Sequence, residues 1–583
     1  MVTSMHIDPN KMVTIKIDGI PVTVPSGTTI MEAAQKIGIK IPSLCHHPDL
    51  GVRAFCRVCL VEDSYSRRLK TACNNLVDEA GDITTNSPKV RRARKTILEL
   101  ILANHPQDCL NCEKNGKCEL QTLAAEYNIR SNIFDPVWKP VPKEMSNPSL
   151  VRDMVKCVRC GRCVEACQAV QTTNAIGFSG RSTDFKITTA FEKPLDQSSC
   201  VYCGQCVAVC PVGALYEKDD TQRVWDAIDN PDKFVIVQTA PAVRVAIGEE
   251  FGMARGSIAT GKMVSALRRL GFDRVFDTNF GADLTIMEEG HELLDRIQHG
   301  GVLPMITSCS PGWINFVEKN YPDLLPHVSS CKSPQQMFGA IAKTYYADKM
   351  GIPRDKMFVV SVMPCIAKKY ECQRPEMFSS GYQDVDCVIT TRELAKMIRI
   401  AGLNFDSLPE EEFDNPLGLG SGAGAIFGTS GGVMEAAIRT VYEEVTGRVP
   451  ESLDFTACRG QQGVKEATLD MDGVPIKVAI TNGLKNARYL MDKIRAGEAD
   501  YQFIEVMCCP GGCIGGGGQP FRTTAAIRAH RMDGLYKVDK SLPVRQSNKN
   551  PDIITLYKEY LEEPNSHLAH ELLHTHYTDR SNH

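Results

Sequence analysis

Two runs of cysteines with identical spacing constrain this 583-residue chain more than any other feature. The runs are Cys157-x2-Cys160-x2-Cys163-x3-Cys167 and Cys200-x2-Cys203-x2-Cys206-x3-Cys210, the second followed by proline. This repeat is typical of chains that hold two [4Fe-4S] clusters, because the fourth cysteine of each run binds the cluster of the other run. The repeat therefore predicts two crossed ligand sets: Cys157, Cys160, Cys163 and Cys210 for one cluster, and Cys200, Cys203, Cys206 and Cys167 for the other.

The remaining cysteines indicate iron-sulfur chemistry along the whole chain. Of 24 cysteines, fifteen precede residue 211 in close groups and nine follow residue 300. The chain starts without the apolar region of a signal peptide, so we expect metal clusters rather than disulfides, and a cytoplasmic location. A net charge of -4 argues against a nucleic-acid partner, and no segment has the length and apolarity of a membrane span.

The N-terminal segment predicts a small sheet and a cluster loop. Residues 12–24 predict two strands joined at Asp18-Gly19, and Thr28 to Gly38 predicts a helix. Four cysteines follow as one distant residue, a close pair and another distant residue, which is the layout of a plant-type [2Fe-2S] site with a longer first gap. The segment resembles a β-grasp ferredoxin domain, and a structural zinc site is the alternative for the same thiolates. The predicted ligands are Cys45, Cys56, Cys59 and Cys73.

A second cluster site follows a predicted helix at residues 88–104. The ligand pattern is His105-x3-Cys109-x2-Cys112-x5-Cys118. One imidazole and three thiolates can hold a [4Fe-4S] cluster, and a histidine in place of a thiolate reduces the negative charge at the cluster. The alternative for His105 is a surface or capping histidine.

From about residue 221 the pattern changes to strand-like apolar runs that alternate with helix-like segments, as in an α/β domain. Three cysteine-bearing turns lie at or near the predicted strand ends, at residues 307–313, 363–371 and 505–518. The last is glycine-rich, which lets the backbone approach a bulky inorganic cluster closely.

These three turns resemble the signatures of the [FeFe]-hydrogenases, and the upstream modules match, in order, the accessory domains of the larger members. The implied fold is multidomain, α+β and α/β. Its expected parts are a β-grasp [2Fe-2S] domain (1–88), a one-His/three-Cys [4Fe-4S] domain (89–136), a two-cluster ferredoxin domain (137–220) and an α/β catalytic domain (221–583).

The resemblance implies an active cluster made of a [4Fe-4S] cubane bridged by a thiolate to a two-iron subsite with CO, cyanide and azadithiolate. Cys365, Cys509 and Cys513 match cubane ligands, with Cys513 as the bridge. Cys309 matches the thiol that passes protons, and Lys368 matches a hydrogen-bond donor to cyanide. The expected wall of the two-iron subsite is Pro241, Gln335, Met363, Phe427 and Met507.

A proton route is expected along a predicted helix at residues 282–297. Glu289, Glu292 and Arg296 are spaced three and four apart, so they share one helix face. The resemblance adds Ser329 to this route. The alternative is a solvated helix face with ordinary ion pairs.

One position departs from the family pattern. The family has two adjacent cysteines in the first turn, whereas this chain has Ser310 after Cys309. A serine oxygen is a harder donor with a much higher pKa than a thiol, and it binds iron less readily. Four arrangements stay open: Ser310 ligates the cubane, Cys309 takes over ligation, or Cys331 or Cys508 substitutes.

The expected function is reversible conversion of H2 to protons and electrons, relayed through one [2Fe-2S] and three [4Fe-4S] accessory clusters. The expected electron partners are ferredoxin or NAD(P)-linked flavin/iron-sulfur subunits, because the chain has no flavin or NAD motif of its own. Two alternatives remain: an electron-transfer subunit, and an impaired relative that acts in H2 sensing or cluster assembly. The four histidines at 567, 570, 574 and 576 are interpreted as a surface helix.

Overall fold

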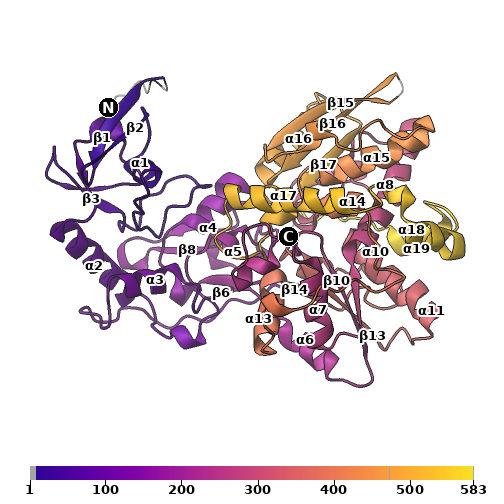
Figure 1. Cartoon of the computed structure of the whole chain (residues 1–583), viewed down its shortest axis with the longest axis horizontal. Coiled ribbons are helices and arrows are strands. Elements are labelled where there is room, and N and C mark those ends of the chain that lie inside the picture. The colour runs from indigo at the N-terminus through magenta and orange to yellow at the C-terminus, as the bar shows by residue number, and fades with distance from the viewer. Residues whose placement is uncertain (1–7, 9, 472, 582–583) are drawn as a thin grey trace.

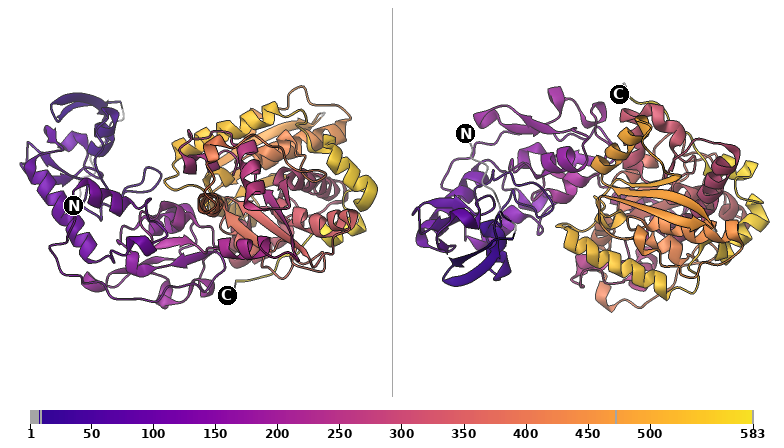
Figure 2. Two further views of the ribbon diagram at one scale, coloured as in Figure 1. Left: turned by 60° about the horizontal axis from the view of Figure 1, so that its bottom comes forward. Right: turned by 90° about the horizontal axis from the view of Figure 1, so that it is seen from above.

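The computed structural model describes residues 8, 10–471 and 473–581. The N-terminal modules form an arm in indigo and purple beside a larger C-terminal body, as Figures 1 and 2 show. All 24 cysteines are free thiols, in agreement with the expectation of clusters instead of disulfides. Among the described residues, no helix combines the length and apolarity that crossing a membrane requires.

The first module is a five-stranded sheet with one helix against it. Its strand order is β2-β1-β5-β3-β4. The predicted hairpin is present, since Ile17 pairs with Ile20 and both Asp18 (φ 50°) and Gly19 (φ 82°) adopt the left-handed turn conformation. Thr29 caps the helix with Glu32 in a capping box. The elements are β1 (Met12–Ile17), β2 (Ile20–Pro25), α1 (Ile30–Lys36), β3 (Leu60–Asp63), β4 (Leu69–Thr71) and β5 (Ile83–Thr84).

Four helices and two small two-stranded antiparallel sheets build the rest of the arm. Ser87 caps the long helix that precedes the histidine, and a shorter helix follows the last cysteine of that site. The duplicated cysteine runs each lead into a short helix. The elements are α2 (Pro88–Ala103), α3 (Glu119–Glu126), β6 (Leu150–Arg152), α4 (Arg162–Glu165), β7 (Gly177–Ser179), β8 (Lys186–Thr188), α5 (Gln205–Val209) and β9 (Leu215–Glu217).

The C-terminal body holds two four-stranded sheets. The first is parallel with the order β11-β10-β13-β14, as expected for strands buried between helices. The second is mixed, with the order β12-β17-β16-β15. The strands are β10 (Phe234–Thr239), β11 (Arg274–Asp277), β12 (Met305–Ile306), β13 (Met357–Met363), β14 (Cys387–Thr390), β15 (Val464–Met471), β16 (Val474–Asn482) and β17 (Phe503–Met507).

The long helix α8 (Thr278–His299) is the main packing element between the sheets. Asp277 caps its start, Gly300 (φ 73°) ends it, and it packs against α10, α14 and α15. The other helices are α6 (Thr221–Ile228), α7 (Thr260–Leu270), α9 (Pro311–Asn320), α10 (Pro334–Ile341), α11 (Ala347–Met350), α12 (Lys368–Glu371), α13 (Thr391–Ile400), α14 (Gly422–Ile426), α15 (Gly432–Thr446), α16 (Leu484–Arg495), α17 (Ala525–Ser541), α18 (Pro551–Leu556) and α19 (His567–Leu573).

The C-terminal histidines do not all lie on a surface helix. His567 is exposed, but His574 follows α19 and is buried, where its ring nitrogens lie 2.8 Å from Ser330 Oγ and 3.1 Å from Glu288 Oε2. The interpretation of these histidines as a surface helix is therefore wrong for His574. The chain end folds back onto α8, a contact that helical spacing alone does not reveal.

Candidate iron-sulfur and active-site cavities

The structure brings each predicted ligand set of the duplicated runs to its own cavity. One buried cavity is lined by Cys157, Cys160, Cys163 and Cys210. A second cavity is lined by Cys167, Cys200, Cys203 and Cys206. Each cavity therefore takes three thiols from one run and the fourth from the other, the crossed arrangement that two cubanes require.

The two runs also share their backbone conformation. Arg159 and Tyr202 occupy the same place in each run, with φ of 56° and 58°, and their N–H groups donate to the sulfurs of Cys157 and Cys200 at 3.3 and 3.4 Å. Gly161 (φ 80°) in the first run starts α4 in the same way that Gly204 (φ 71°) starts α5. Amide donors to a ligand sulfur stabilise its negative charge, so the loops suit cluster binding.

The four cysteines of the first module also converge. The sulfurs of Cys59 and Cys73 are 3.4 Å apart, and the N–H of Leu44 donates to Cys56 at 3.4 Å. Hydrogen bonds from Cys56 and then Cys73 lower the pKa of the Cys45 thiol. Four clustered thiols can hold either [2Fe-2S] or zinc, and the identity of the metal comes from the family match below.

His105 lies directly after α2 and is buried. Its Nδ1 has no hydrogen-bond partner among the described residues, and burial lowers the pKa of the ring, which favours the neutral form that binds metals. Cys109 starts a short 3-10 turn and Cys118 caps α3, so local elements present the predicted donors around one loop. An orphaned buried imidazole nitrogen fits a ligand better than a surface histidine.

We expect His105→Cys to keep a cluster in place and to lower its reduction potential by roughly 100–300 mV, because a thiolate adds negative charge where imidazole was neutral. Redox titration followed by electron paramagnetic resonance would measure this shift, with the other clusters of the same sample as internal controls. Unchanged potentials for every cluster would exclude His105 as a ligand.

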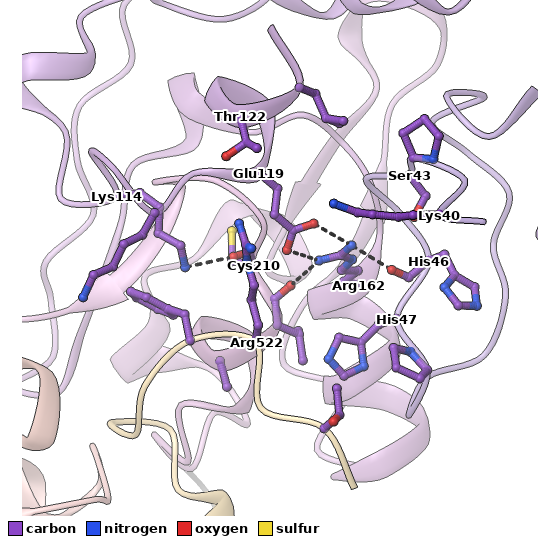
Figure 3. A pocket seen from close by; sticks show the side chains of 18 of the residues that line it. Lys40, Ser43, His46, His47, Lys114, Glu119, Thr122, Arg162, Cys210 and Arg522 are labelled. Atoms are coloured by element: carbon purple, nitrogen blue, oxygen red, sulfur yellow. Dashed lines mark hydrogen bonds and ion pairs between the residues drawn. The ribbon is translucent and has the colours of Figure 1, made fainter. Parts of the chain in front are cut away.

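A basic pocket lies beside these clusters, where the first module, the His105 segment and the loop before α17 meet (Figure 3). Arg162 donates to both carboxylate oxygens of Glu119 and to the carbonyl of His46. The ammonium group of Lys114 is buried and donates to the carbonyl of Cys210 at 3.1 Å. Burial lowers the pKa of the Lys114 amino group to about 7. Below this pH its positive charge lies next to one predicted cubane, where it stabilises the reduced form.

Below pH 7, where Lys114 carries its positive charge, Lys114→Met is expected to lower the reduction potential of that cubane by roughly 50–100 mV. This is the effect of one unit charge at roughly 7–10 Å and an effective dielectric constant near 20. Lys117→Met is the matched control, since Lys117 lines the same pocket but is paired with Glu250. Equal shifts in the two variants would show that the buried charge of Lys114 has no special effect.

The three cysteine-bearing turns meet at one largely apolar cavity in the C-terminal body. The turns leave β12, β13 and β17 at their carboxyl ends. The parallel pairing of β12 and β17 places the first and third turns side by side, and the second turn reaches the cavity from β13 in the other sheet. The cavity contains the thiols and lysine expected from the sequence: Cys309, Cys365, Lys368, Cys509 and Cys513. It also contains Ser310, Cys508 and the complete expected wall of Pro241, Gln335, Met363, Phe427 and Met507.

Glu371 anchors the polar edge of this cavity. Its carboxylate accepts hydrogen bonds from Lys368 Nζ at 2.8 Å and from Gln335 Nε2 at 3.1 Å, while Lys368 Nζ also donates to the carbonyl of Cys309 at 3.2 Å. The side-chain oxygen Oε1 of Gln335 is buried without a hydrogen-bond partner among the described residues. Glu371 thus holds the ammonium group of Lys368 at the edge of the cavity, where its N–H groups can donate hydrogen bonds to a bound group.

A buried acid chain leads from the surface to this cavity. Arg296 Nη2 donates to Glu292 at 2.6 Å, and Ser329 Oγ donates to the other oxygen of Glu292 at 2.7 Å. Glu289, one turn earlier on α8, is 3% exposed, and burial followed by the charge of Glu292 raises its pKa to about 8. Glu289 in turn acts on the Cys309 thiol, whose pKa is raised well above its usual value by burial and then by this carboxyl.

Two of the open arrangements at Ser310 can be judged from position. Cys331 does not line the cavity: its sulfur lies 3.6 Å from Glu292 Oε2, at the outer end of the acid chain. Cys508 does line it, and its N–H donates to Ser310 Oγ at 3.1 Å.

Sequence reasoning did not single out Glu371 or Glu505. Glu371 has a visible signal, an i, i+3 spacing from Lys368 within the second turn. Glu505 is fully buried and accepts hydrogen bonds from the N–H groups of Gly431 and Met434. These bonds fix the start of α15, shortly after Phe427 in the chain. Nothing in the local sequence predicts that contact.

A cavity of thiols fed by a buried acid chain, behind successive cysteine sites, defines a redox enzyme that exchanges protons and electrons: a hydrogenase. Family models agree along the chain. They match a 2Fe-2S iron-sulfur cluster binding domain (10–88), the NADH-ubiquinone oxidoreductase-G iron-sulfur binding region (94–132), a 4Fe-4S dicluster domain (156–214), the C-terminal domain of the iron only hydrogenase large subunit (233–517) and the iron hydrogenase small subunit (525–580).

The chain belongs to the [FeFe]-hydrogenase (iron-only hydrogenase) family. It is 50% identical over 584 residues to the NADP-reducing hydrogenase subunit HndD of Solidesulfovibrio fructosivorans, covering 98% of this chain and 99% of that protein. It is 42% identical over 576 residues to iron hydrogenase 1 of Clostridium pasteurianum, covering 97% and 100%. A solved structure of the [FeFe]-hydrogenase from Chlamydomonas reinhardtii matches with a TM-score of 0.56 and 46% identity, covering 62% of this chain and 99% of that chain.

These matches confirm the main functional prediction. The protein is a hydrogenase that interconverts H2 and protons and carries accessory iron-sulfur clusters. The alternatives of an electron-transfer subunit and of an impaired relative are not favoured, because the full-length matches are to hydrogenases and the catalytic domain is present.

Proposed function

We propose that hydrogen is converted at the cavity of Cys309, Cys365, Cys509 and Cys513. The observation that carries this assignment is the meeting of the thiols with the acid chain that ends at Glu289. Thiols alone would fit a purely electron-transferring cluster, whereas a buried acid chain ending beside the cavity provides the proton exchange that H2 chemistry requires.

The residues fit the family's active cluster, a cubane joined to a two-iron subsite with CO, cyanide and azadithiolate. Cys365, Cys509 and Cys513 would hold it, with Cys513 as the bridge, and when bound it supplies the site where H2 is split or formed. The largely apolar wall of Pro241, Met363, Phe427 and Met507 excludes water from the cavity. Lys368, held by Glu371, offers an N–H donor to a cyanide.

The acid chain would move protons between Cys309 and the protein surface. Glu289 is protonated at neutral pH because its pKa is raised to about 8, so it can return a proton to Cys309 after that thiol has given up its own. Ser329 donates to Glu292 and can accept from Glu289, which makes it a relay between the two carboxyls. Arg296 marks the outer end of the chain and holds Glu292 in position.

Electrons would enter through the arm. We propose one [2Fe-2S] cluster and three [4Fe-4S] clusters, in domains 1–88, 89–136 and 137–220, with a β-grasp fold for the first and residues 221–583 as the catalytic domain. The arm is packed tightly against the active-site loop: Gln205 Nε2 donates to the carbonyl of Gly515 and Gln171 Nε2 to that of Cys508, both at 3.0 Å. This close packing supports electron transfer from the Cys203 cluster into the active site.

For the electron partner we propose NAD(P)-linked flavin/iron-sulfur subunits, with ferredoxin as the second candidate. The similarity to the NADP-reducing hydrogenase subunit HndD supports this choice. The compartment we propose is the cytoplasm, on the sequence expectation above.

An infrared spectrum of the purified, maturated protein tests the proposed active site. We expect sharp bands of iron-bound CO and cyanide together with H2-dependent reduction of a dye. Cluster absorption without these bands would overturn the assignment of the cavity to the two-iron subsite.

A further inference from the structure

The active-site cavity holds more sulfur than its conventional ligand set requires. Five thiols line it, and Ser310 lies among them: Cys309, Cys365, Cys508, Cys509 and Cys513. A [4Fe-4S] cluster is held by four thiolates. Cys365, Cys509 and Cys513 provide three, so the fourth donor is Cys309, Cys508 or Ser310.

Cys309 lies on the proton side of the cavity. Its carbonyl accepts from Lys368 Nζ, and its thiol lies close enough to Glu289 for that carboxyl to be the main charge acting on it. It also packs against the apolar cluster that includes Phe427 and Met507. A thiol bound permanently to iron could not exchange a proton with Glu289, so Cys309 is better placed for the acid chain than for the cubane.

Cys508 lies on the electron side of the cavity. Its thiol lies close enough to the thiols of Cys203, a predicted ligand of the neighbouring accessory cubane, and of Cys509, a predicted ligand of the active cubane, for these two groups to be the main causes of its raised pKa. Strand β17 ends at Met507, so the alternation of side chains along a strand no longer separates Cys508 from Cys509. Both thiols are buried, at 3% and 6% exposure.

Ser310 has a different role in this arrangement. Its Oγ accepts the N–H of Cys508 at 3.1 Å, so the hydroxyl holds the backbone of the cysteine that follows β17. An oxygen donor is also hard and has a high pKa, which makes it a weaker iron ligand than any of the thiols around it.

Gly312 provides the space that the Cys508 sulfur occupies. A Cβ atom at residue 312 would lie 2.7 Å from Cys508 Sγ and 3.6 Å from Cys203 Cβ. The first contact is too close for any side chain, including alanine. Ser310, Gly312 and Cys508 therefore pack together, with the Cys508 sulfur in the space that a side chain at residue 312 would fill.

We propose that Cys508, and not Ser310, supplies the fourth protein ligand of the active-site cubane. Ser310 is then a positioning residue that fixes the Cys508 backbone. Because Cys508 also contacts Cys203, the ligands of the accessory and active cubanes touch directly, which gives electrons a short path between them. The inference rests on the proposed active site, since it concerns a ligand of its cubane.

The decisive measurement is Mössbauer spectroscopy of the full-length, 57Fe-loaded protein, combined with iron analysis. Cys508→Ser exchanges sulfur for oxygen at nearly constant volume. We expect one cubane to gain a unique iron site with oxygen-like parameters and a shifted reduction potential. Cys508→Ala should lose iron from one cubane, giving a [3Fe-4S] signal or about four fewer iron atoms per chain.

The matched control is Cys309→Ser, which makes the same exchange in the same cavity and should leave the cubane parameters unchanged. Ser310→Ala should also keep the cubane's iron. A wild-type Mössbauer spectrum in Cys508→Ser would overturn the proposal, as would an altered cubane in Cys309→Ser. Thermal unfolding of each variant identifies samples that have lost their fold.

Gly312→Ala adds an independent test, because its methyl group must displace the Cys508 sulfur. We expect perturbed cubane parameters in Gly312→Ala and a return toward the wild-type iron content in the Gly312→Ala/Ser310→Cys double variant, which offers a thiol from the first turn. The CO and cyanide infrared bands of the wild-type protein do not depend on this ligand, so they report on the proposed active site separately.

Discussion

Cys309→Ala is expected to reduce hydrogen turnover by about 10²–10⁴-fold, the usual cost of removing a positioned acid-base group. The iron content and the infrared bands should stay unchanged, because the cubane is held by other thiols. The reason is positional: Cys309 is the cavity thiol next to Glu289, at the inner end of the acid chain.

The measurement combines H2 evolution and H2 oxidation assays with infrared spectra of the same sample. Cys458→Ala is the matched control, since Cys458 is a fully buried thiol of the same body that does not line the cavity. Loss of the cubane in Cys309→Ala would mean that this thiol is a ligand. Undiminished turnover with an intact cluster would show that Cys309 is neither a proton carrier nor a cubane ligand.

Glu289→Gln is expected to lower turnover by a similar factor, about 10²–10⁴-fold, because glutamine cannot give up or take up the proton that passes between Ser329 and Cys309. The wild-type enzyme should also lose H2-evolving activity as the pH rises through about 8. Burial raises the pKa of Glu289 to about this value, so the carboxyl carries its proton below it and has lost it above. This decline should be absent from the residual activity of Glu289→Gln.

Glu288→Gln serves as the control for this effect. Glu288 precedes Glu289 on α8 and is equally buried, but it accepts from Tyr557 and Asn565 and does not face the cavity. Turnover in Glu288→Gln should stay within a few-fold of the wild-type rate. If Glu288→Gln and Glu289→Gln lost activity equally, the loss would result from a destabilised α8 and not from impaired proton transfer.

The acid chain and the cysteine sites reach the active cavity from different directions. In the proposed mechanism protons would arrive along α8, on the side of Cys309, whereas the accessory run with Cys203 lies on the side of Cys508. Because the two paths are separate, a mutation can change one of them without affecting the other. Variants of the acid chain should alter the pH profile, and variants of the accessory sites should alter the potentials.

The features that the sequence predicted correctly are local ones. The Asp18-Gly19 hairpin and the Thr29-capped helix follow from backbone preferences of a few residues. The crossed grouping of the thiols of the duplicated runs into two cavities agrees with their spacing, because each short loop can present only certain sulfurs to one site. Their role as cluster ligands stays a prediction. The one face shared by Glu289, Glu292 and Arg296 follows from the period of the α-helix.

Contacts between distant segments were decided only by the tertiary structure. Ser310 and Cys508 are 198 residues apart, and their hydrogen bond exists because the parallel pairing of β12 and β17 brings the two turns to the same sheet edge. The sulfur that packs against Gly312 belongs to Cys508, in the third turn. The burial of His574 depends on a chain end folding onto α8, 286 residues earlier. The sequence by itself determined which residues can bind iron. The sheet register determined which of them meet, because pairing between strands is set by packing summed over the whole body and not by any local preference.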